Sequence, residues 1–128
     1  MDIKKLIIAA KEASEHSYSP YSKYKVGAAL LTRNGKIYTG TNVENASFPA
    51  GMCAERVALF DAVKNGEKEF EALAIYADGE NFPFPCGICR QVISEFTRDI
   101  KIIIARNEEE YVVKNISELL PDTFEFSA

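Results

Sequence analysis

Three residue types are scarce in this sequence: its 128 residues include three cysteines, one histidine and no tryptophan. The odd number of cysteines argues against a disulfide framework, because a chain in which 47% of the residues are hydrophobic can bury a core without covalent cross-links. This use of cysteine fits a reducing environment. We therefore expect a cytoplasmic protein that forms one domain over residues 1–128.

Long apolar runs are also missing. The apolar run at residues 6–10 follows two lysines, as the core of a signal peptide would, but Lys11 and Glu12 end it before the roughly 7–15 residues that a signal peptide requires. No run approaches the ~18 apolar residues of a membrane span. We therefore expect no membrane association.

An excess of positive charge is absent as well. The sequence has 15 Lys and Arg against 19 Asp and Glu, which gives a formal net charge of −4, and it has no basic run. Proteins bind nucleic-acid polymers through a footprint of Lys and Arg that neutralises the phosphates. The composition therefore argues against a nucleic-acid polymer as partner and leaves small molecules open.

Hydrophobic periodicity predicts helices and strands that alternate along most of the chain. Asn34-Gly35 is a strong hairpin signal, because both residues tolerate positive φ angles and apolar runs flank them. The predicted helices cover residues 3–17, 53–63 and 87–96, with a helical turn at 116–120. The predicted strands cover residues 26–31, 37–39, 73–77, 100–105 and 111–113.

This alternation favours an α/β fold with one mixed sheet and helices packed on its faces. In such folds, binding sites gather at strand ends and at helix N-termini. The loops at residues 42–52 and 78–85 each lead directly into a predicted helix. These two loops are therefore the best places to look for a site.

All three cysteines lie at the beginning of predicted helices: Cys53 opens one, and Cys86 and Cys89 open another. Unpaired N–H groups at a helix N-terminus favour the thiolate, which is the form that binds a metal. The two-residue spacer between Cys86 and Cys89 is a usual chelating spacing for zinc. Three sulfur ligands leave the fourth position of a tetrahedral zinc to water, which is typical of catalytic sites.

Polar residues near the cysteines complete a candidate catalytic site. Glu55 would lie near a bound metal, where its carboxylate could take a proton from water and pass it on. We predict that Arg56 donates hydrogen bonds to the sulfurs, because three thiolates and one Zn²⁺ leave a net negative charge for it to offset. Gln91 is a second candidate donor to the sulfurs.

Two interpretations without catalysis remain open at this point. Residues 86–89 have the Cys-x-x-Cys spacing of thioredoxin-like redox proteins, although the motif lies late in the chain with no preceding tryptophan and leaves Cys53 and Glu55 unexplained. His16 could instead close a structural zinc site as a fourth ligand. A histidine at the end of a surface helix is, however, more often solvated.

Cys53-Ala54-Glu55, followed by Pro-Cys-Gly-Ile-Cys at residues 85–89, resembles the signature of the zinc-dependent cytidine deaminases. The resemblance is to the small homotetrameric type and covers nearly the whole chain. The segments that carry it are residues 21–29, 42–47, 53–56, 86–91 and 118–121.

The resemblance implies a three-layer α/β/α sandwich around a mixed five-stranded sheet. It also implies one Zn²⁺ per subunit, held by Cys53, Cys86 and Cys89, which makes hydroxide available for attack at C4 of cytosine. Glu55 would take the proton from that water, protonate ring N3 and later deliver a proton to the leaving amino group. The products would be uridine or deoxyuridine and ammonia, as in pyrimidine salvage.

Contacts to the substrate are implied as well. Asn42 and Glu44 match the positions that bind the ribose hydroxyls, and an amide beside a carboxylate suits such hydroxyls. Ala54 matches a position whose backbone contacts the base, and Tyr24 stands where the family more often has Phe, with a ring that can pack on the nucleoside. Phe124 matches an aromatic residue that reaches a neighbouring subunit's active site, which implies a homotetramer with shared sites.

Other functions remain as alternatives to this leading hypothesis. A deaminase of a cytosine nucleoside antibiotic such as blasticidin S would share the zinc signature, although Asn42 and Glu44 favour plain ribose. Editing of RNA or DNA conflicts with the acidic charge and with the lack of a basic and aromatic groove pattern. Outside the enzymes, the alternative is a structural zinc protein or a thiol-redox protein.

Overall fold

The computed structural model describes residues 1–126 and places five strands and four α-helices within them. The chain begins with α1 (Ile3–Ser14) and the hairpin of β1 (Val26–Thr32) and β2 (Ile37–Thr41). The later elements are the short 3-10 helix η1 (Phe48–Ala50), α2 (Ala54–Lys64), β3 (Phe70–Ala77), α3 (Gly87–Phe96), β4 (Lys101–Ala105), β5 (Tyr111–Asn115) and α4 (Ile116–Leu119). In this described part of the chain, no helix is long and apolar enough to cross a membrane.

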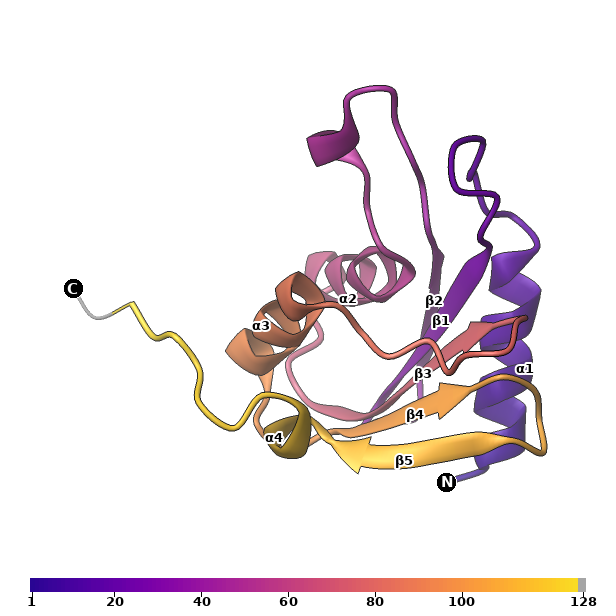
Figure 1. The fold of residues 1–128 in the computed structure, drawn as a ribbon. Helices are drawn as coiled ribbons and strands as arrows, with labels where there is room; N and C mark the ends of the chain where they lie inside the picture. Colours follow the sequence, from indigo (N-terminus) through magenta and orange to yellow (C-terminus); the bar gives the residue numbers. More distant parts are fainter. Residues whose placement is uncertain (127–128) are drawn as a thin grey trace.

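The strands form one mixed sheet in the order β2-β1-β3-β4-β5. β3 and β4 run parallel, with α3 in the crossover between them, and the other neighbouring strands are antiparallel. Figure 1 shows α1 against one face of the sheet and α2 and α3 against the other. The predicted mixed five-stranded sheet between two helical layers is therefore confirmed.

Small residues allow α1 to lie close to the sheet. The helix buries Leu6, Ile7 and Ala10 against a sheet face that is rich in alanine. Gly27 of β1 marks the closest approach, because a Cβ atom at this position would lie 1.7 Å from the carbonyl oxygen of Ala10. This face is therefore filled by structural packing and leaves the opposite face for a site.

On the opposite face, α2 packs against β2 in a similar way. The buried side of α2 carries Ala54, Ala58 and Ala62. A Cβ atom on Gly40 of β2 would lie 2.5 Å from the backbone nitrogen of Ala58 and 2.6 Å from the carbonyl oxygen of Ala54. Because Cys53 directly precedes α2, the bare backbone at Gly40 helps to determine where Cys53 lies.

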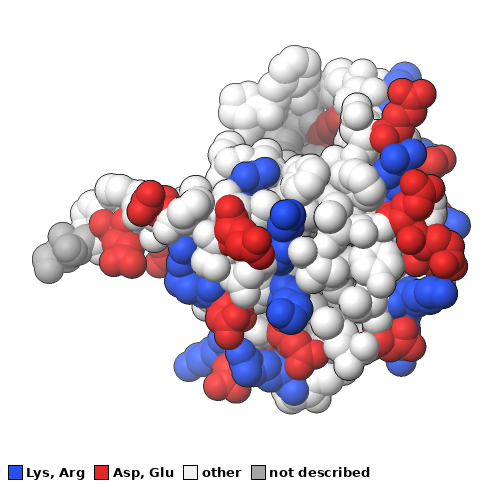
Figure 2. Space-filling view, turned by 60° about the horizontal axis from the view of Figure 1, so that its bottom comes forward, with Lys and Arg blue, Asp and Glu red and all other residues white. Residues whose placement is uncertain are grey.

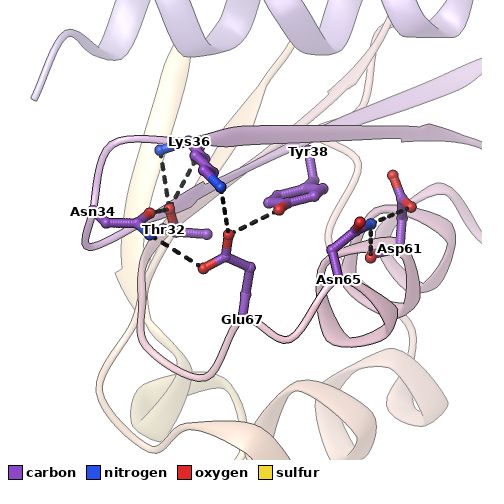
Figure 3. A network of polar contacts seen from close by, with 7 residues as sticks. All are labelled: Thr32, Asn34, Lys36, Tyr38, Asp61, Asn65 and Glu67. Atoms are coloured by element: carbon purple, nitrogen blue, oxygen red, sulfur yellow. Dashed lines mark hydrogen bonds and ion pairs between the residues drawn. The ribbon is translucent and has the colours of Figure 1, made fainter.

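A polar network joins the β1–β2 hairpin to the segment that follows α2 (Figure 3). The Glu67 carboxylate accepts a hydrogen bond from the Tyr38 hydroxyl at 2.8 Å and lies 4.0 Å from the ammonium group of Lys36. Gly35 adopts the positive φ angle of 90° at the turn. The predicted hairpin is confirmed, and Glu67 links it to the helical layer.

Strands β2 and β5 each extend two residues beyond their predicted ends, and three other segments differ in ways that have a clear physical reason. The first helix ends at Ser14 instead of residue 17, because the next three N–H groups bind carbonyl oxygens only three residues earlier and form a tighter turn. β3 starts at Phe70, ahead of the predicted start, since the exposed Glu71 interrupts an apolar pattern that actually begins at the buried Phe70. The loop predicted at residues 42–52 contains the turn η1, which begins where Pro49 fixes the backbone.

Charges of both signs are mixed on the surface. Figure 2 shows Lys and Arg side chains interspersed with Asp and Glu side chains on the face in view. A nucleic-acid footprint needs Lys and Arg clustered on one face. On the face in view, the two signs of charge are interspersed.

We expect Gly40→Ala to destabilise the protein by about 1–3 kcal/mol, because the added methyl group would overlap the α2 backbone. Chemical denaturation would measure the free energy of unfolding. The matched control is Gly79→Ala, where a Cβ atom would meet nothing within 4 Å. Equal stability of the two variants would contradict the proposed close contact between β2 and α2.

Candidate active site

Two helix N-termini bring the three cysteines together. Cys53 directly precedes α2, Cys86 directly precedes α3, and Cys89 lies in the first turn of α3. Their sulfur atoms all lie within 4.8 Å of one another, and the sulfurs of Cys53 and Cys86 are 4.0 Å apart. The structure therefore joins two motifs that are far apart in the sequence into one cluster.

The cluster has the dimensions of a zinc site. With Zn–S bonds of about 2.3 Å, two sulfurs on one tetrahedral ion lie about 3.8 Å apart. The backbone N–H of Cys89 donates to the sulfur of Cys86 at 3.5 Å, which orients that sulfur at the beginning of α3. Within residues 1–126, the cluster has three members, and His16 lies outside it on the exposed turn after α1. The residues present thus fit a zinc ion with one open position.

The groups around Cys53 favour its thiolate. A hydrogen bond from the Cys89 thiol, together with one from Nη2 of Arg56 at 3.5 Å, lowers the pKa of Cys53 to about 5. The same contact with Cys53 and the burial of the side chain raise the pKa of Cys89. One negative sulfur therefore sits next to the Arg56 guanidinium even without a metal.

Glu55 is buried beside the cysteines, with 5% of its surface exposed. This burial raises the pKa of Glu55 to about 7, and the nearby negative charge of Cys53 adds to the effect. A carboxyl group with a pKa near neutrality can both accept and release a proton at physiological pH. Glu55 therefore has the properties of a proton carrier.

A cavity of about 590 Å³ opens over Glu55 and the cysteine cluster. Ligand sites for small molecules usually have volumes of ~300–1,000 Å³. Figure 1 shows the segments at residues 17–25 and 42–52 projecting side by side beyond the sheet, where Tyr18 and Val43 pair through their backbones. Residues of both segments line the cavity, and residues 82–86 also contribute to its wall.

Some residues that line the cavity were missed by the sequence analysis. They are three aromatic residues and one serine: Phe48, Phe82, Phe84 and Ser22. Ser22 lies within one of the segments that carry the resemblance, whereas the three phenylalanines are marked only by their place in loops that lead toward motif residues. Aromatic loop residues can equally cover a core, so their position beside the site depends on how the loops fold.

Asn42 lines the cavity with its amide held in one orientation. Its Oδ1 accepts hydrogen bonds from the Ser17 hydroxyl at 2.6 Å and from the N–H of Val26 at 3.0 Å, while Nδ2 donates to the carbonyl oxygen of Tyr24 at 2.7 Å. An amide carries two N–H donors, and these contacts use one of them. Asn42 can therefore offer a donor to a ligand.

Glu44 also lines the cavity, and it is fixed by the segment that follows α1. Its Oε1 accepts from the N–H groups of Tyr21 at 3.0 Å and Ser22 at 3.1 Å, and its Oε2 accepts from the Ser22 hydroxyl. The hydrogen bond from that hydroxyl lowers the pKa of Glu44 below its ordinary value. An ionised carboxylate with further lone pairs thus faces the cavity beside Asn42.

Of the other predicted site residues, Ala54 and Tyr24 line the cavity. Gln91 and Phe124 are placed differently: Nε2 of Gln91 donates to the carbonyl oxygen of Phe124 at 3.0 Å, and the N–H of Phe124 donates back to Oε1 at 3.4 Å. The amide of Gln91 therefore binds the C-terminal segment in place of the predicted contact with the sulfurs. The Phe124 side chain is 71% exposed.

Comparison with known proteins identifies the family. The family described as "Cytidine and deoxycytidylate deaminase zinc-binding region" matches residues 1–106. A cytidine deaminase of Sporosarcina psychrophila is 45% identical over 97% of this chain and 92% of its own length. The crystal structure of a cytidine deaminase from Burkholderia pseudomallei has a TM-score of 0.93 at 43% identity, covering 97% of this chain and 100% of that chain. The chain belongs to the cytidine and deoxycytidylate deaminase family.

Other relatives agree with this assignment. A cytidine deaminase of Halalkalibacterium halodurans is 42% identical over 97% of this chain and 95% of its own length. Membership of a zinc-binding deaminase family agrees with three cysteines that lie close together and could hold a zinc ion. Zinc is therefore the cofactor, and the alternatives of a thiol-redox protein, a structural zinc protein and an antibiotic deaminase are not favoured.

The lowered pKa of Cys53 predicts its reactivity in protein freed of metal by a chelator. Because the thiolate forms above about pH 5 in the folded protein, alkylation of Cys53 by iodoacetamide will level off by about pH 6 and slow as the pH falls below 5. At pH 6 it will be roughly ten times faster than alkylation of an ordinary thiol. Peptide mass mapping measures the modification of each cysteine.

The control is the same chain unfolded in urea, where Cys53 returns to its ordinary pKa of 9.0. Its alkylation should then rise steadily up to that pH. A folded protein with the same pH profile as the unfolded chain would contradict the assignment of a stabilised thiolate at Cys53.

Proposed function

We propose that this chain catalyses the hydrolytic deamination of cytidine and deoxycytidine to uridine and deoxyuridine with release of ammonia. One observation carries the proposal: the Glu55 carboxyl, Cys53 and Cys86 line one cavity of a size suited to small molecules, and the sulfur of Cys89 lies within 4.8 Å of the other two sulfurs. Cys53, Cys86 and Cys89 are the proposed ligands of one Zn²⁺ per subunit. Such a reaction serves pyrimidine salvage in the cytoplasm.

The proton transfers of the reaction are assigned to Glu55. Zinc bound at the three sulfurs supplies Lewis-acid activation of water. Glu55 takes a proton from the attacking water and gives a proton to N3 of cytosine, which makes C4 a better electrophile. Glu55 then takes the second proton of the same water and delivers it to the amino group. The C4–N bond breaks with ammonia as the leaving group. The Glu55 pKa of about 7 suits both directions of transfer.

Arg56 is proposed to keep the cysteines in their ionised form. Its Nη2 lies 3.5 Å from the sulfur of Cys53, and its positive charge opposes the repulsion among the thiolates. Gln91 makes its hydrogen bonds with the backbone of Phe124. Its proposed contribution to the site is therefore to hold the C-terminal segment in place.

Recognition of the sugar is assigned to Asn42 and Glu44. The spare N–H of Asn42 can donate to a ribose hydroxyl, and the ionised Glu44 can accept from one. The Tyr24 ring and the backbone of Ala54 are proposed to contact the nucleoside in the same cavity. The two polar groups are already oriented before the substrate binds.

The charges of the cavity favour a nucleoside over a nucleotide. Among the described residues that line it, Glu44 and Glu55 are acidic, and Arg56 is the one base. The guanidinium of Arg56 donates to the sulfur of Cys53 through Nη2, so its positive charge is directed at the cysteines. A 5′-phosphate would meet acidic groups without a compensating cation.

The proposed assembly is a homotetramer with shared active sites, each subunit being one domain over residues 1–128. Figure 1 shows the C-terminal segment extending away from the body of the fold. Phe124 on this segment is 71% exposed, and Phe48 at the cavity is 74% exposed. Burial of such aromatic rings against another subunit would stabilise the assembly. An active monomer in gel filtration would contradict this proposal.

Glu55→Gln should keep zinc and lose about 10²–10⁴-fold in kcat, because the amide has the shape of the carboxyl group but cannot carry the proton. Turnover is measured by the ultraviolet absorbance of cytidine together with the release of ammonia, and zinc by metal analysis. The matched control is Glu71→Gln, an exposed carboxylate on β3 that should leave both values unchanged. Near-normal turnover by Glu55→Gln would refute the assigned role.

Substrate comparison tests the assignment of the cavity. Cytidine and deoxycytidine should both be deaminated, and cytidine 5′-monophosphate should have a kcat/KM at least about 10²-fold lower because of repulsion by the acidic groups. Blasticidin S should likewise be a poor substrate. Efficient deamination of the nucleotide would overturn the charge argument, and a preference for blasticidin S would establish the antibiotic as the substrate.

A further inference from the structure

Arg90 on α3 holds two successive carbonyl groups at the beginning of its own helix. Its backbone N–H donates to the carbonyl oxygen of Cys86 at 3.0 Å, as the helical pattern requires. Its side-chain Nε donates to the carbonyl oxygen of Pro85 at 2.7 Å. The two peptide units that flank Cys86 are therefore both held by one residue.

The same guanidinium also reaches the end of α4. Its Nη1 donates to the carbonyl oxygen of Leu119 at 3.0 Å. Arg90 is half-buried, so these hydrogen bonds are partly shielded from competition by water. One side chain thus links the segment that leads into Cys86 to the C-terminal part of the fold.

The segment before Cys86 has few other means of holding its shape. Residues 78–86 contain no helix or strand, and Pro83 and Pro85 cannot donate backbone hydrogen bonds. Both prolines are buried, whereas Phe84 and Cys86 are exposed. A rotation of the peptide unit before Cys86 would therefore move the exposed cysteine without opposition from packing around its own side chain.

We propose that Arg90 is a positioning residue that fixes Cys86 for zinc binding and thereby slows the loss of zinc. The proposal rests on the assignment of Cys53, Cys86 and Cys89 as zinc ligands. Removal of the guanidinium frees the carbonyl of Pro85, and Cys86 then samples orientations in which its sulfur lies away from the other two. Loss of groups that orient a metal ligand typically weakens metal affinity by ~10–100-fold.

Arg98, which lies just beyond the end of α3, provides a matched control. Its Nη2 donates to the carbonyl oxygen of Pro121 at 3.2 Å, and its Nη1 donates to the Ser94 hydroxyl at 3.0 Å. Arg98 therefore ties α3 to the C-terminal segment as Arg90 does, but its contacts lie about two helical turns farther from Cys86. If substitution of either arginine acted only by loosening the C-terminal segment, variants of Arg90 and of Arg98 should lose zinc at similar rates.

The test compares Arg90→Met and Arg98→Met in the zinc-loaded protein. Release of zinc to a chromogenic chelator, at a temperature where both variants are folded, should be about 10–100-fold faster for Arg90→Met than for wild type. Arg98→Met should release zinc at the wild-type rate. Equal release rates in the two variants would overturn the proposal.

Replacement of zinc by Co²⁺ gives a second readout that loss of overall stability does not move. The visible absorption of Co²⁺ depends on the geometry of its sulfur ligands, so the spectrum should change in Arg90→Met and stay as in wild type in Arg98→Met. An unchanged spectrum in both variants would contradict the positioning of Cys86 by Arg90.

Two further variants keep the outcomes distinct. If Arg90→Met does not fold, Arg90→Lys carries the test, because one ammonium group cannot reproduce the planar contacts to both Pro85 and Leu119. Zinc release from Arg90→Lys at the wild-type rate would then overturn the proposal. Cys86→Ser tests the ligand assignment separately: retention of zinc as in wild type would remove that assignment, whatever the Arg90 variants show.

Discussion

The convergence of three sulfur atoms at two helix N-termini is the constraint on which the rest of this structure depends. Sulfurs that share one cation must lie about 4 Å apart, yet thiolates at this distance repel one another. The N–H groups at two helix ends and the Arg56 guanidinium beside Cys53 offset this repulsion. The pKa values of Cys53 and Cys89 shift in opposite directions, mainly because the Cys89 thiol donates a hydrogen bond to the Cys53 sulfur, and the negative charge of Cys53 adds to the rise at Cys89.

The helices and strands around this cluster pack very closely. Gly40 lets α2 lie on β2, and the parallel pair of β3 and β4 carries α3 in its crossover, so both helix ends reach the same region above the sheet. Gly27 likewise allows α1 to pack closely on the opposite face of the sheet, away from the cysteine cluster. The positions of the sulfurs are thus determined by backbone contacts at residues that have no chemical role.

The convergence of Cys53 with the pair at residues 86 and 89 was implied by the resemblance to a known family, because these residues are far apart in the sequence. Local pattern was sufficient to predict the hairpin, the helices that carry the cysteines and the chelating spacing of residues 86 and 89. These features depend on turn chemistry, periodicity and metal-ligand spacing, which are all written within short segments. The partner of Gln91 could not be predicted in this way, because an amide near a metal motif can bind either the sulfurs or a distant backbone. The carbonyl contacts of Arg90 and the cavity-lining ring of Phe82 likewise arise only when separate segments meet.

The hydrogen bonds that hold Glu44 have a consequence for the thermodynamics of binding. A free glutamate side chain loses up to about 1.5–2 kcal/mol of rotamer entropy when a ligand immobilises it. Here the N–H groups of Tyr21 and Ser22 already immobilise the carboxylate, so that entropy is lost during folding and not during association. If Glu44 binds the sugar as proposed, damage to the segment after α1 will appear as a less favourable entropy of binding, with the rate of bond breaking at the base left intact.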